Sequence, residues 1–347
     1  MSLYRKQRIS LILTLLAGIV LIAGCELKKE TQLTGKTMGT TYRVKVVSNY
    51  FASVSHLEKK IKMCLEGINH SLSTYQKDSE ISRFNSIKNA AKPFHSTKDF
   101  FTVMKMGKKL YELTKGAWDG TVDPLVNLWG FGSSGIKYEI PTKSKIETTL
   151  AQVGFDQIDF LPNQMLKKRN SSVKVDLASI AKGYGVDRVV DLLRKNQITD
   201  FLVEIGGEVY AKGRRKDGQK WRVGINEPHK DAPLDAIYAI IELEDKGFAT
   251  SGDYRNFIEI NGKRYSHVID PRTGWPVDNG VVSVSILADT CALADGLATA
   301  IMVMGPKVGQ TLLNHLDSVE GMILVINSYG SLKEYPSKGF QSSRSLN

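Results

Sequence analysis

Residues 176–183 read Asp-Leu-Ala-Ser-Ile-Ala-Lys-Gly, and this stretch decides how the middle of the chain folds. The alternation in Val173–Leu177 predicts a strand, and the apolar spacing from about Ser179 onward predicts a helix. Free backbone N–H groups and the positive end of the helix dipole would then lie beside Lys182, an arrangement that binds phosphate. Asp176 is placed to hold a ribose hydroxyl, an adenine amine or a metal-bound water. Taken alone, the more ordinary interpretation is that Asp176 and Ser179 cap the helix.

A second polar pair lies on the helix predicted for residues 290–304, which ends before Gly305 and Pro306. Asp295 and Thr299 are four residues apart, so their side chains project from nearly the same side of that helix, roughly opposite its apolar residues. A carboxylate and a hydroxyl are hard oxygen donors of the kind that Mg²⁺ prefers. Taken alone, such a pair is more often a local hydrogen bond.

Three further segments surround these two motifs. Residues 203–208, Val-Glu-Ile-Gly-Gly-Glu, place a glycine pair in a predicted strand, which indicates a bulge or a close approach of backbone to a ligand. Residues 249–254, Ala-Thr-Ser-Gly-Asp-Tyr, predict a polar turn. Residues 266–274, Ser-His-Val-Ile-Asp-Pro-Arg-Thr-Gly, predict a strand that ends in a tight turn. Met38 and Tyr75 suit packing on a planar ring, although a protein core uses such side chains equally well.

In this order, residues 38–42 (Met-Gly-Thr-Thr-Tyr), 176–183 and 294–299 (Ala-Asp-Gly-Leu-Ala-Thr) closely resemble the FAD:protein FMN transferases, the ApbE-like lipoproteins. Members of that family attach FMN through a phosphodiester bond to a hydroxyl of another protein. The resemblance runs from about Gly35 to about Ser342. It implies an α+β fold of mostly antiparallel sheets with helices on their faces, and an FAD site in the cleft between two lobes.

The resemblance also implies roles for individual residues. The magnesium ligands would be Ser179, Asp295 and Thr299. The catalytic base would be His267, with Asp270 as the alternative. Residues 116–125 resemble the family's Gly-Ala-Phe-Asp segment, with Trp118 in place of Phe or Met. The FAD contacts would be Met38, Tyr75, Ala117, Trp118, Asp119, Asp176, Lys182 and Ile269.

The activity implied is Mg²⁺-dependent phosphoryl transfer from FAD that releases AMP. The resemblance implies a Thr or Ser acceptor in a Ser/Asp-Gly-Ala-Thr-like motif of membrane redox subunits, such as those of the sodium-pumping quinone reductase or the Rnf-type complex. Two alternatives stay open at the level of sequence. A metal-dependent FAD pyrophosphatase would produce FMN and AMP with water, and a non-catalytic FAD-binding lipoprotein would keep FAD intact.

The first residues predict an address outside the cytoplasm. Arg5, Lys6 and Arg8 precede an apolar stretch that is too short for a comfortable membrane span and ends in small residues before Cys25. This pattern predicts a lipoprotein signal peptide over residues 1–24 and lipidation of Cys25, hence attachment to the membrane on its extracytoplasmic side. A polar linker over residues 25–34, a two-lobed catalytic domain over 35–342 and a tail over 343–347 would follow.

Composition is ordinary for a globular protein, with 42% hydrophobic residues and a net charge of +11. Outside the cytoplasm a basic surface indicates an anionic bilayer rather than nucleic acid, so no nucleic-acid partner is expected. Cys64 and Cys291 stand far apart and form no metal-binding spacing, so a disulfide and two buried thiols both remain open. Residues 132–141 are rich in Gly and Ser, which predicts a loop. Helical periodicity predicts helices over 54–72, 100–114, 142–153 and 179–195. The remaining apolar segments predict strands over 42–46, 201–209, 221–226, 236–243, 257–260, 281–286 and 321–326.

Overall fold

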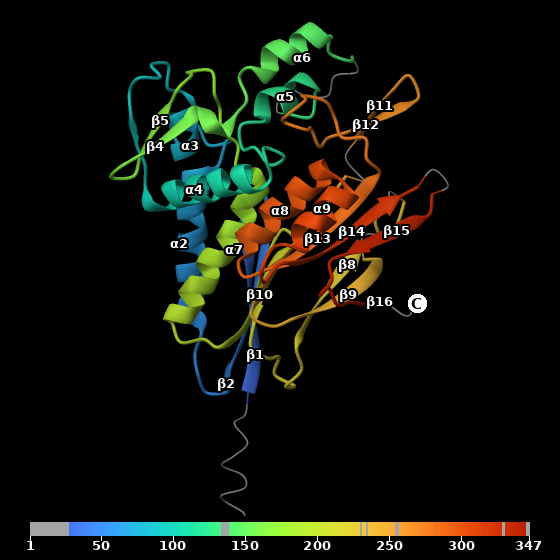
Figure 1. Ribbon diagram of the computed structural model, residues 1–347. Coiled ribbons are helices and arrows are strands. Elements are labelled where there is room, and N and C mark those ends of the chain that lie inside the picture. The colour runs from blue at the N-terminus through green and yellow to red at the C-terminus, as the bar shows by residue number, and fades with distance from the viewer. Residues whose placement is uncertain are drawn as a thin grey trace, which may run out of the picture.

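The computed structural model describes residues 28–132, 139–229, 231–233, 235–253, 257–327 and 330–344. The predicted signal peptide and Cys25 lie outside the described residues, as does most of the predicted loop over 132–141. Figure 1 shows sheets in the lower half of the molecule, long helices packed against one face, and a group of short elements at the top. The prediction of an α+β fold with mostly antiparallel sheets is therefore confirmed.

The centre of the fold is an antiparallel sheet of eight strands. In spatial order these are β1 (Lys28–Thr37), β2 (Thr40–Asn49), β6 (Asp200–Ile205), β7 (Glu208–Lys212), β10 (Lys246–Gly252), β13 (Val281–Ala288), β14 (Glu320–Ile326) and β15 (Leu332–Pro336). Side chains alternate across it because successive residues of a strand point to opposite faces. Val203 and Ile205 of β6 join the main core under the helices, whereas Leu202 faces a second, smaller core.

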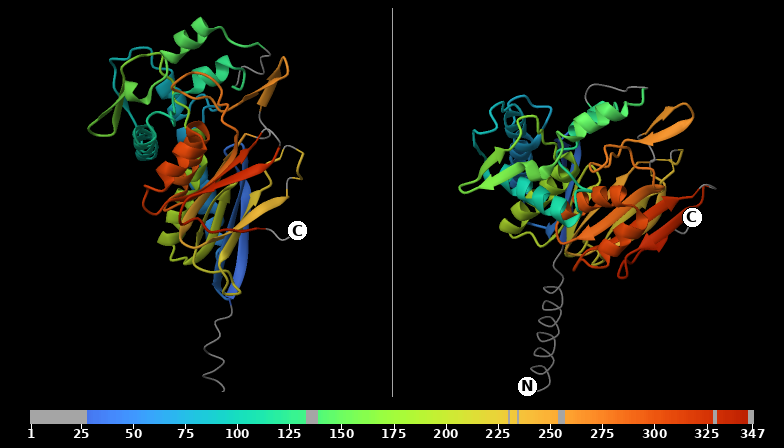
Figure 2. Two further views of the ribbon diagram at one scale, coloured as in Figure 1. Left: turned by 45° about the vertical axis from the view of Figure 1, so that its right-hand side comes forward. Right: turned by 45° about the horizontal axis from the view of Figure 1, so that its top comes forward.

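Three small sheets complete the strands. The sheet β16-β9-β8, formed by Ser343–Arg344, Ile237–Leu243 and Trp221–Asn226, covers part of the second face of the large sheet (Figure 2). The other two are the hairpin of β11 (Phe257–Ile260) and β12 (Lys263–Ser266), and the sheet β3-β5-β4, formed by Phe94–His95, Met165–Lys168 and Ile158–Leu161.

Helices cover the first face, chiefly α2 (Ser55–Leu72), α4 (Lys98–Leu113), α7 (Ala178–Lys195), α8 (Cys291–Met304) and α9 (Pro306–Leu313), with the short α3 (Glu80–Asn85) beside α2. The helices α5 (Asp123–Leu128) and α6 (Lys143–Leu150) pack on each other in the group of short elements at the top (Figure 1). The helix α8 lies over β10 and β13 and packs beside α7 (Figure 1). The two axes approach closely because Gly183 has no side chain: a Cβ atom there would lie 2.6 Å from the carbonyl oxygen of Cys291. No helix within the described residues has both the length and the apolar character needed to cross a membrane.

The strand predicted for residues 173–177 is wrong. Val173, Val175 and Leu177 are buried as the alternation required, but the segment joins none of the sheets that the structure describes. Its backbone groups bind elsewhere. The Asn85 side chain accepts from the Val175 N–H at 2.7 Å and donates to the Val175 carbonyl at 2.8 Å, and the Asp176 N–H donates to the Gly120 carbonyl at 2.7 Å. The expected buried alternation is therefore satisfied without a partner strand.

Turn chemistry corrects two more predictions. The predicted strand over 201–209 is interrupted at Gly206 and Gly207, whose φ angles of 60° and 105° form a hairpin turn between β6 and β7. The polar turn predicted for residues 249–254 is largely strand β10, paired with β7 and β13. In residues 266–274 the turn at Asp270 is present, but the strand before it is reduced to one bridge between Ile269 and Pro276.

The predicted domain boundaries also shift at both ends. Residues 28–34, assigned to a polar linker, belong to β1, which pairs with β2 along its whole length. Polar side chains are compatible with this strand because it is the edge of the large sheet. Ser343 and Arg344, assigned to the tail, pair with β9. Cys64 and Cys291 are both free thiols. The division into two lobes stays a prediction.

Candidate functional site

The central motifs meet in one cavity of about 200 Å³. It is lined by residues of five separated segments: the start of α7, the start of β7, the end of β10, the segment after β12, and α8. The lining includes Ser179, Lys182, Glu208, Ser251, His267, Asp295 and Thr299. The chain thus gathers a cation, two carboxylates, hydroxyls and an imidazole around a single small space.

The N-terminus of α7 forms one wall of this cavity. The helix begins at Ala178, whose N–H donates to the Asp176 carboxylate at 2.8 Å. Burial raises the pKa of Asp176, although this hydrogen bond opposes the rise. Ser179 does not act as the cap, because it lies inside the helix and its hydroxyl accepts the indole N–H of Trp118 at 3.0 Å. Neither residue is the N-cap, which is Leu177, but the Asp176 carboxylate satisfies the first backbone N–H of α7 from the position before it.

Lys182 and Glu208 form an ion pair across the cavity, with 2.6 Å between Nζ and Oε1. The turn at Gly206 and Gly207 positions Glu208 at the first residue of β7, where its side chain is buried. Burial lowers the pKa of Lys182, but the charges of Glu208 and Asp295 outweigh it and leave the pKa above its usual value. A lysine that stays charged at a helix N-terminus is suited to holding phosphate oxygens.

Asp295 is a buried carboxylate, and its Oδ2 accepts the Gly183 N–H at 3.1 Å. This bond depends on the close approach of α7 and α8 at Gly183. Burial, with Glu208 next in effect, raises the pKa of Asp295 well above its usual value. Two buried carboxylates near one lysine leave the cavity short of positive charge, which a bound cation would offset.

The donor set around Asp295 fits Mg²⁺. Thr299 lies one turn further along α8, and its hydroxyl is 3.2 Å from that of Ser251. With the oxygens of Ser179 these are hard ligands. The Oε2 atom of Glu208 is buried and has no hydrogen-bond partner among the described residues. No group of three or more His, Cys, Asp or Glu side chains suited to a metal occurs in the described part of the chain. A metal here would therefore depend on hydroxyl, backbone and substrate oxygens.

His267 lines the same cavity and is half-buried. Its ring meets the edge of Phe131 at 6.3 Å between centroids. The buried carboxylate of Asp253 is near enough to His267 for the charge of the imidazole to affect it. Burial raises the pKa of Asp253, whereas Arg264 and, to a smaller extent, His267 lower that pKa. Asp270 does not reach the cavity. Its carboxylate binds the guanidinium of Arg272 at 2.8 Å and closes the following turn, so the alternative base is engaged elsewhere.

A second cavity, of about 510 Å³, adjoins the first. Met38, Tyr75, Asp176 and Lys182 all line it, as the resemblance implied for FAD contacts. Tyr75 is 92% exposed, so its ring is free to cover a ligand. Met38 occupies the tip of the β1-β2 hairpin. Ala178 and Lys182 line both cavities, so the two spaces are adjacent at the N-terminus of α7.

Four of the expected FAD contacts lie in neither cavity. Ala117, Trp118 and Asp119 are buried behind the wall that α7 forms, and Ile269 is buried in a separate cluster near α5 and α6. The Asp119 carboxylate accepts the N–H groups of Thr121 and Phe155, and burial raises its pKa to about 6. Trp118 reaches the site only through its hydrogen bond to Ser179.

Sequence reasoning overlooked Glu208 and Ser251 as lining residues of the cavity, and Asp253 as a charged neighbour of His267. The signal for Glu208 was its place directly after the glycine pair, where a two-residue hairpin turn fixes the direction of the next side chain. Ser251 and Asp253 were hidden by the assignment of their segment to a polar turn. A serine in a paired strand faces a defined side, and here that side is α8.

The site combines two adjacent cavities with the N-terminus of α7 and Lys182. This arrangement suits an extended ligand that contains phosphate. A family model described as the ApbE family matches residues 38–323. The chain therefore belongs to the ApbE family.

Named relatives agree with this assignment. The FAD:protein FMN transferase of Vibrio cholerae is 42% identical over 333 residues, covering 95% of this chain and 97% of that protein. The FAD:protein FMN transferase of Haemophilus influenzae is 40% identical over 305 residues, covering 86% and 88%. Among solved structures, the flavin transferase ApbE from Vibrio cholerae gives a TM-score of 0.81 at 41% identity, covering 90% of this chain and 99% of that one. The apo form of the Pseudomonas stutzeri flavinyl transferase ApbE gives 0.80 at 35% identity, covering 90% and 95%.

Proposed function

We propose that this protein is an FAD:protein FMN transferase, which cleaves FAD, attaches FMN to a hydroxyl of an acceptor protein and releases AMP. The observation that carries the proposal is that the two cavities adjoin at Ala178 and Lys182, which line both. The larger cavity offers room and an exposed aromatic ring for the flavin nucleotide. The smaller one brings a lysine, a helix N-terminus and His267 to the point where a pyrophosphate would lie.

The reaction we propose is a direct displacement at the FMN phosphorus. His267 accepts the proton of the acceptor hydroxyl while the hydroxyl oxygen forms a bond to that phosphorus. The bond between the phosphorus and the bridging oxygen breaks, and AMP leaves with that oxygen. Lys182 and the N–H groups of α7 hold the phosphate oxygens throughout, so the negative charge that builds on the leaving group is met by fixed positive charge.

Mg²⁺ is part of this proposal. The oxygens of Ser179, Asp295 and Thr299 would hold the ion, and the buried negative charge of Asp295 and Glu208 supports a cation there. When bound, Mg²⁺ supplies neutralisation of pyrophosphate charge. Asp176 lines the larger cavity, and its carboxylate accepts the first backbone N–H of α7. It would contact FAD from within that cavity.

The acceptor and the location follow from the family resemblance. We propose that the acceptor residue is a Thr or Ser in a Ser/Asp-Gly-Ala-Thr-like motif of an extracytoplasmic redox subunit, such as one of the sodium-pumping quinone reductase or the Rnf-type complex. The Ile-Ala-Gly-Cys pattern ending at Cys25 supports a lipid anchor that holds the protein at the membrane on the same side.

A product assay distinguishes this function from its alternatives. The purified full-length protein is incubated with FAD, Mg²⁺ and a soluble acceptor domain. FMN bound to the acceptor together with free AMP supports the transferase. Free FMN and AMP indicate a pyrophosphatase, and unchanged FAD indicates a binding protein alone.

A further inference from the structure

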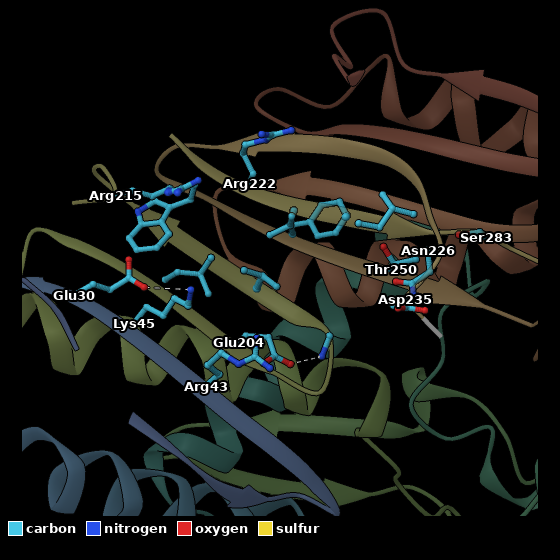
Figure 3. A pocket seen from close by; sticks show the side chains of 18 of the residues that line it. Glu30, Arg43, Lys45, Glu204, Arg215, Arg222, Asn226, Asp235, Thr250 and Ser283 are labelled. Atoms are coloured by element: carbon cyan, nitrogen blue, oxygen red, sulfur yellow. Dashed lines mark hydrogen bonds and ion pairs between the residues drawn. The ribbon is translucent and has the colours of Figure 1, made fainter. Parts of the chain in front are cut away.

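A broad groove of about 1190 Å³ lies on the side of the large sheet away from the long helices. Figure 3 shows side chains from several strands pointing into it. Its floor is built from alternate residues of neighbouring strands, such as Arg43 of β2, Glu204 of β6 and Thr250 of β10. Its wall is β8, including Arg222 and Asn226. The groove therefore runs across the large sheet beneath the smaller sheet.

One end of this groove reaches the reaction cavity. Thr250 and Gly252 line both spaces, and Ser251 between them is the partner of Thr299. The groove and the larger cavity assigned to FAD have no lining residue in common. The small cavity thus lies between the other two spaces and shares lining residues with each: Ala178 and Lys182 with the FAD pocket, and Thr250 and Gly252 with the groove at the end of β10. In an in-line displacement, the attacking and leaving oxygens stand on opposite sides of the phosphorus.

The groove carries a surplus of positive charge. Its basic side chains are Arg43, Lys45, Arg215, Lys216 and Arg222, against three acidic ones. Lys45 is paired with Glu30 at 3.2 Å, and Arg215 with Asp217 at 3.0 Å. Arg43, Lys216 and Arg222 are exposed and form no ion pair with any residue that the structure describes. These three charges are available to a partner that carries carboxylates.

The wall of the groove also offers a strand edge. Within the described sheets, β8 pairs only with β9, so its second edge has no partner strand. An unpaired edge is a template for an extended polypeptide, because backbone N–H and C=O groups stand ready for a ladder.

We propose that this groove docks the acceptor protein, through an extended segment that carries acidic side chains and presents its hydroxyl at the Thr250–Gly252 end. The inference rests on the proposed transfer function and adds the surface by which the acceptor is recognised. Carboxylates of the segment bind Arg43, Lys216 and Arg222. The hydroxyl then reaches His267 from the side opposite to FAD.

The test uses the full-length protein and two labelled synthetic peptides. One has a single threonine flanked by aspartates, and the other has lysines in place of the aspartates. Binding is measured by fluorescence anisotropy without FAD, so the result does not depend on turnover. The variant is Arg43→Glu with Arg222→Glu, and the matched control is Lys59→Glu with Lys109→Glu, two exposed lysines on α2 and α4.

We expect the aspartate peptide to bind the wild type at least tenfold more tightly than the lysine peptide. The groove variant should lose that preference and the control should keep it, with unchanged melting temperatures and FAD affinity in both. Equal affinity of the wild type for the two peptides, or an equal loss in the control, would overturn the proposal. A groove variant that binds FAD weakly but the aspartate peptide normally would assign the groove to FAD instead. Failure of the transfer assay with normal peptide selectivity would count against the transferase function alone.

Discussion

The Asp295 carboxylate accepts a hydrogen bond from the backbone N–H of Gly183 at 3.1 Å. This bond joins the two motifs that the sequence presents far apart, the α7 segment and the acidic residue of α8. It also fixes the carboxylate beside Lys182, where its negative charge raises the lysine pKa. The reaction cavity is therefore built at a helix-to-helix contact that only glycine permits.

Replacing Asp295 by Asn tests the role of this charge. The amide oxygen can still accept the Gly183 N–H, so the fold should be kept, but a neutral amide holds a divalent cation more weakly than a carboxylate does. We expect FMN transfer to fall by roughly 10²–10³-fold, with a smaller loss of FAD affinity. The measurements are steady-state transfer and FAD titration.

The control for that variant is Asp187→Asn. Asp187 is a half-buried carboxylate that also accepts backbone N–H groups, from Cys291 and Ala292 at the start of α8, but it does not line the cavity. It should lower thermal stability and leave the rate of transfer nearly unchanged. Equal losses of activity in the two variants would count against a specific role for Asp295.

Replacing His267 by Ala tests the general base. We expect transfer to fall by roughly 10²–10⁴-fold with nearly unchanged FAD affinity, and added imidazole to restore part of the rate. His315→Ala, on the exposed end of α9, should have no effect. Near-normal transfer by folded His267→Ala protein would assign proton removal to another group.

Replacing Trp118 by Phe tests how the buried indole acts on the site. The smaller phenyl ring leaves part of the indole's space empty, and Ser179 loses its N–H donor. We expect a loss of about 1 kcal/mol in the free energy of unfolding from the hydrogen bond, with a further loss from the cavity. A double-mutant cycle with Ser179→Ala should show that the two effects are not additive. Full additivity in urea denaturation would mean that the bond contributes nothing.

The Asp119 carboxylate predicts a pH dependence of stability. Its pKa of about 6 in the folded protein lies above the usual value of 3.8, so the folded state binds this proton more tightly than the unfolded state. Its contribution to folding is therefore fully present below pH about 4 and is lost as the pH rises to about 6, by at most about 1.4 kcal/mol per pH unit.

Asp119→Asn should remove this slope. The free energy of unfolding of the wild type, measured by urea denaturation and compared with that of the variant, should decrease across this window. A difference that stays constant from pH about 4 to about 7 would show that Asp119 does not titrate there.

Much of this fold was predictable from periodicity alone. The helix predicted for residues 54–72 is α2, and the strand predicted for residues 221–226 is β8. Each element has one buried side, which sets the spacing of its apolar residues along the sequence. The strand predicted for Val173–Leu177 is wrong because buried side chains alternate in this segment as they would in a strand, although its backbone is bound by the Asn85 side chain and not by a neighbouring strand. The extent of β10 was missed because its polar side chains bind neighbouring elements: Ser251 contacts Thr299 of α8, and Thr250 contacts Ser285 of β13.

The candidate site was partly predictable for a related reason. Two local helical motifs contain the predictable residues, Lys182 in one and Asp295 with Thr299 in the other. Within each motif, helical spacing predicts which side of the helix carries the polar side chains. Glu208 comes to Lys182 only through the pairing of β6 with β7 and their neighbours, and long-range pairing leaves little trace in a single sequence. Trp118 and Asp119 were assigned to the pocket itself, whereas core packing draws the indole and the carboxylate behind it.

The central claim is that the acceptor hydroxyl attacks the FMN phosphorus of FAD. The most direct test is transfer with two FAD samples, one labelled at the phosphorus on the flavin side and one at the phosphorus on the adenosine side. We predict that the flavin-side label appears on the acceptor protein and the adenosine-side label appears in free AMP, in equal amounts. An adenosine-side label on the acceptor, with free FMN as the second product, would contradict the account.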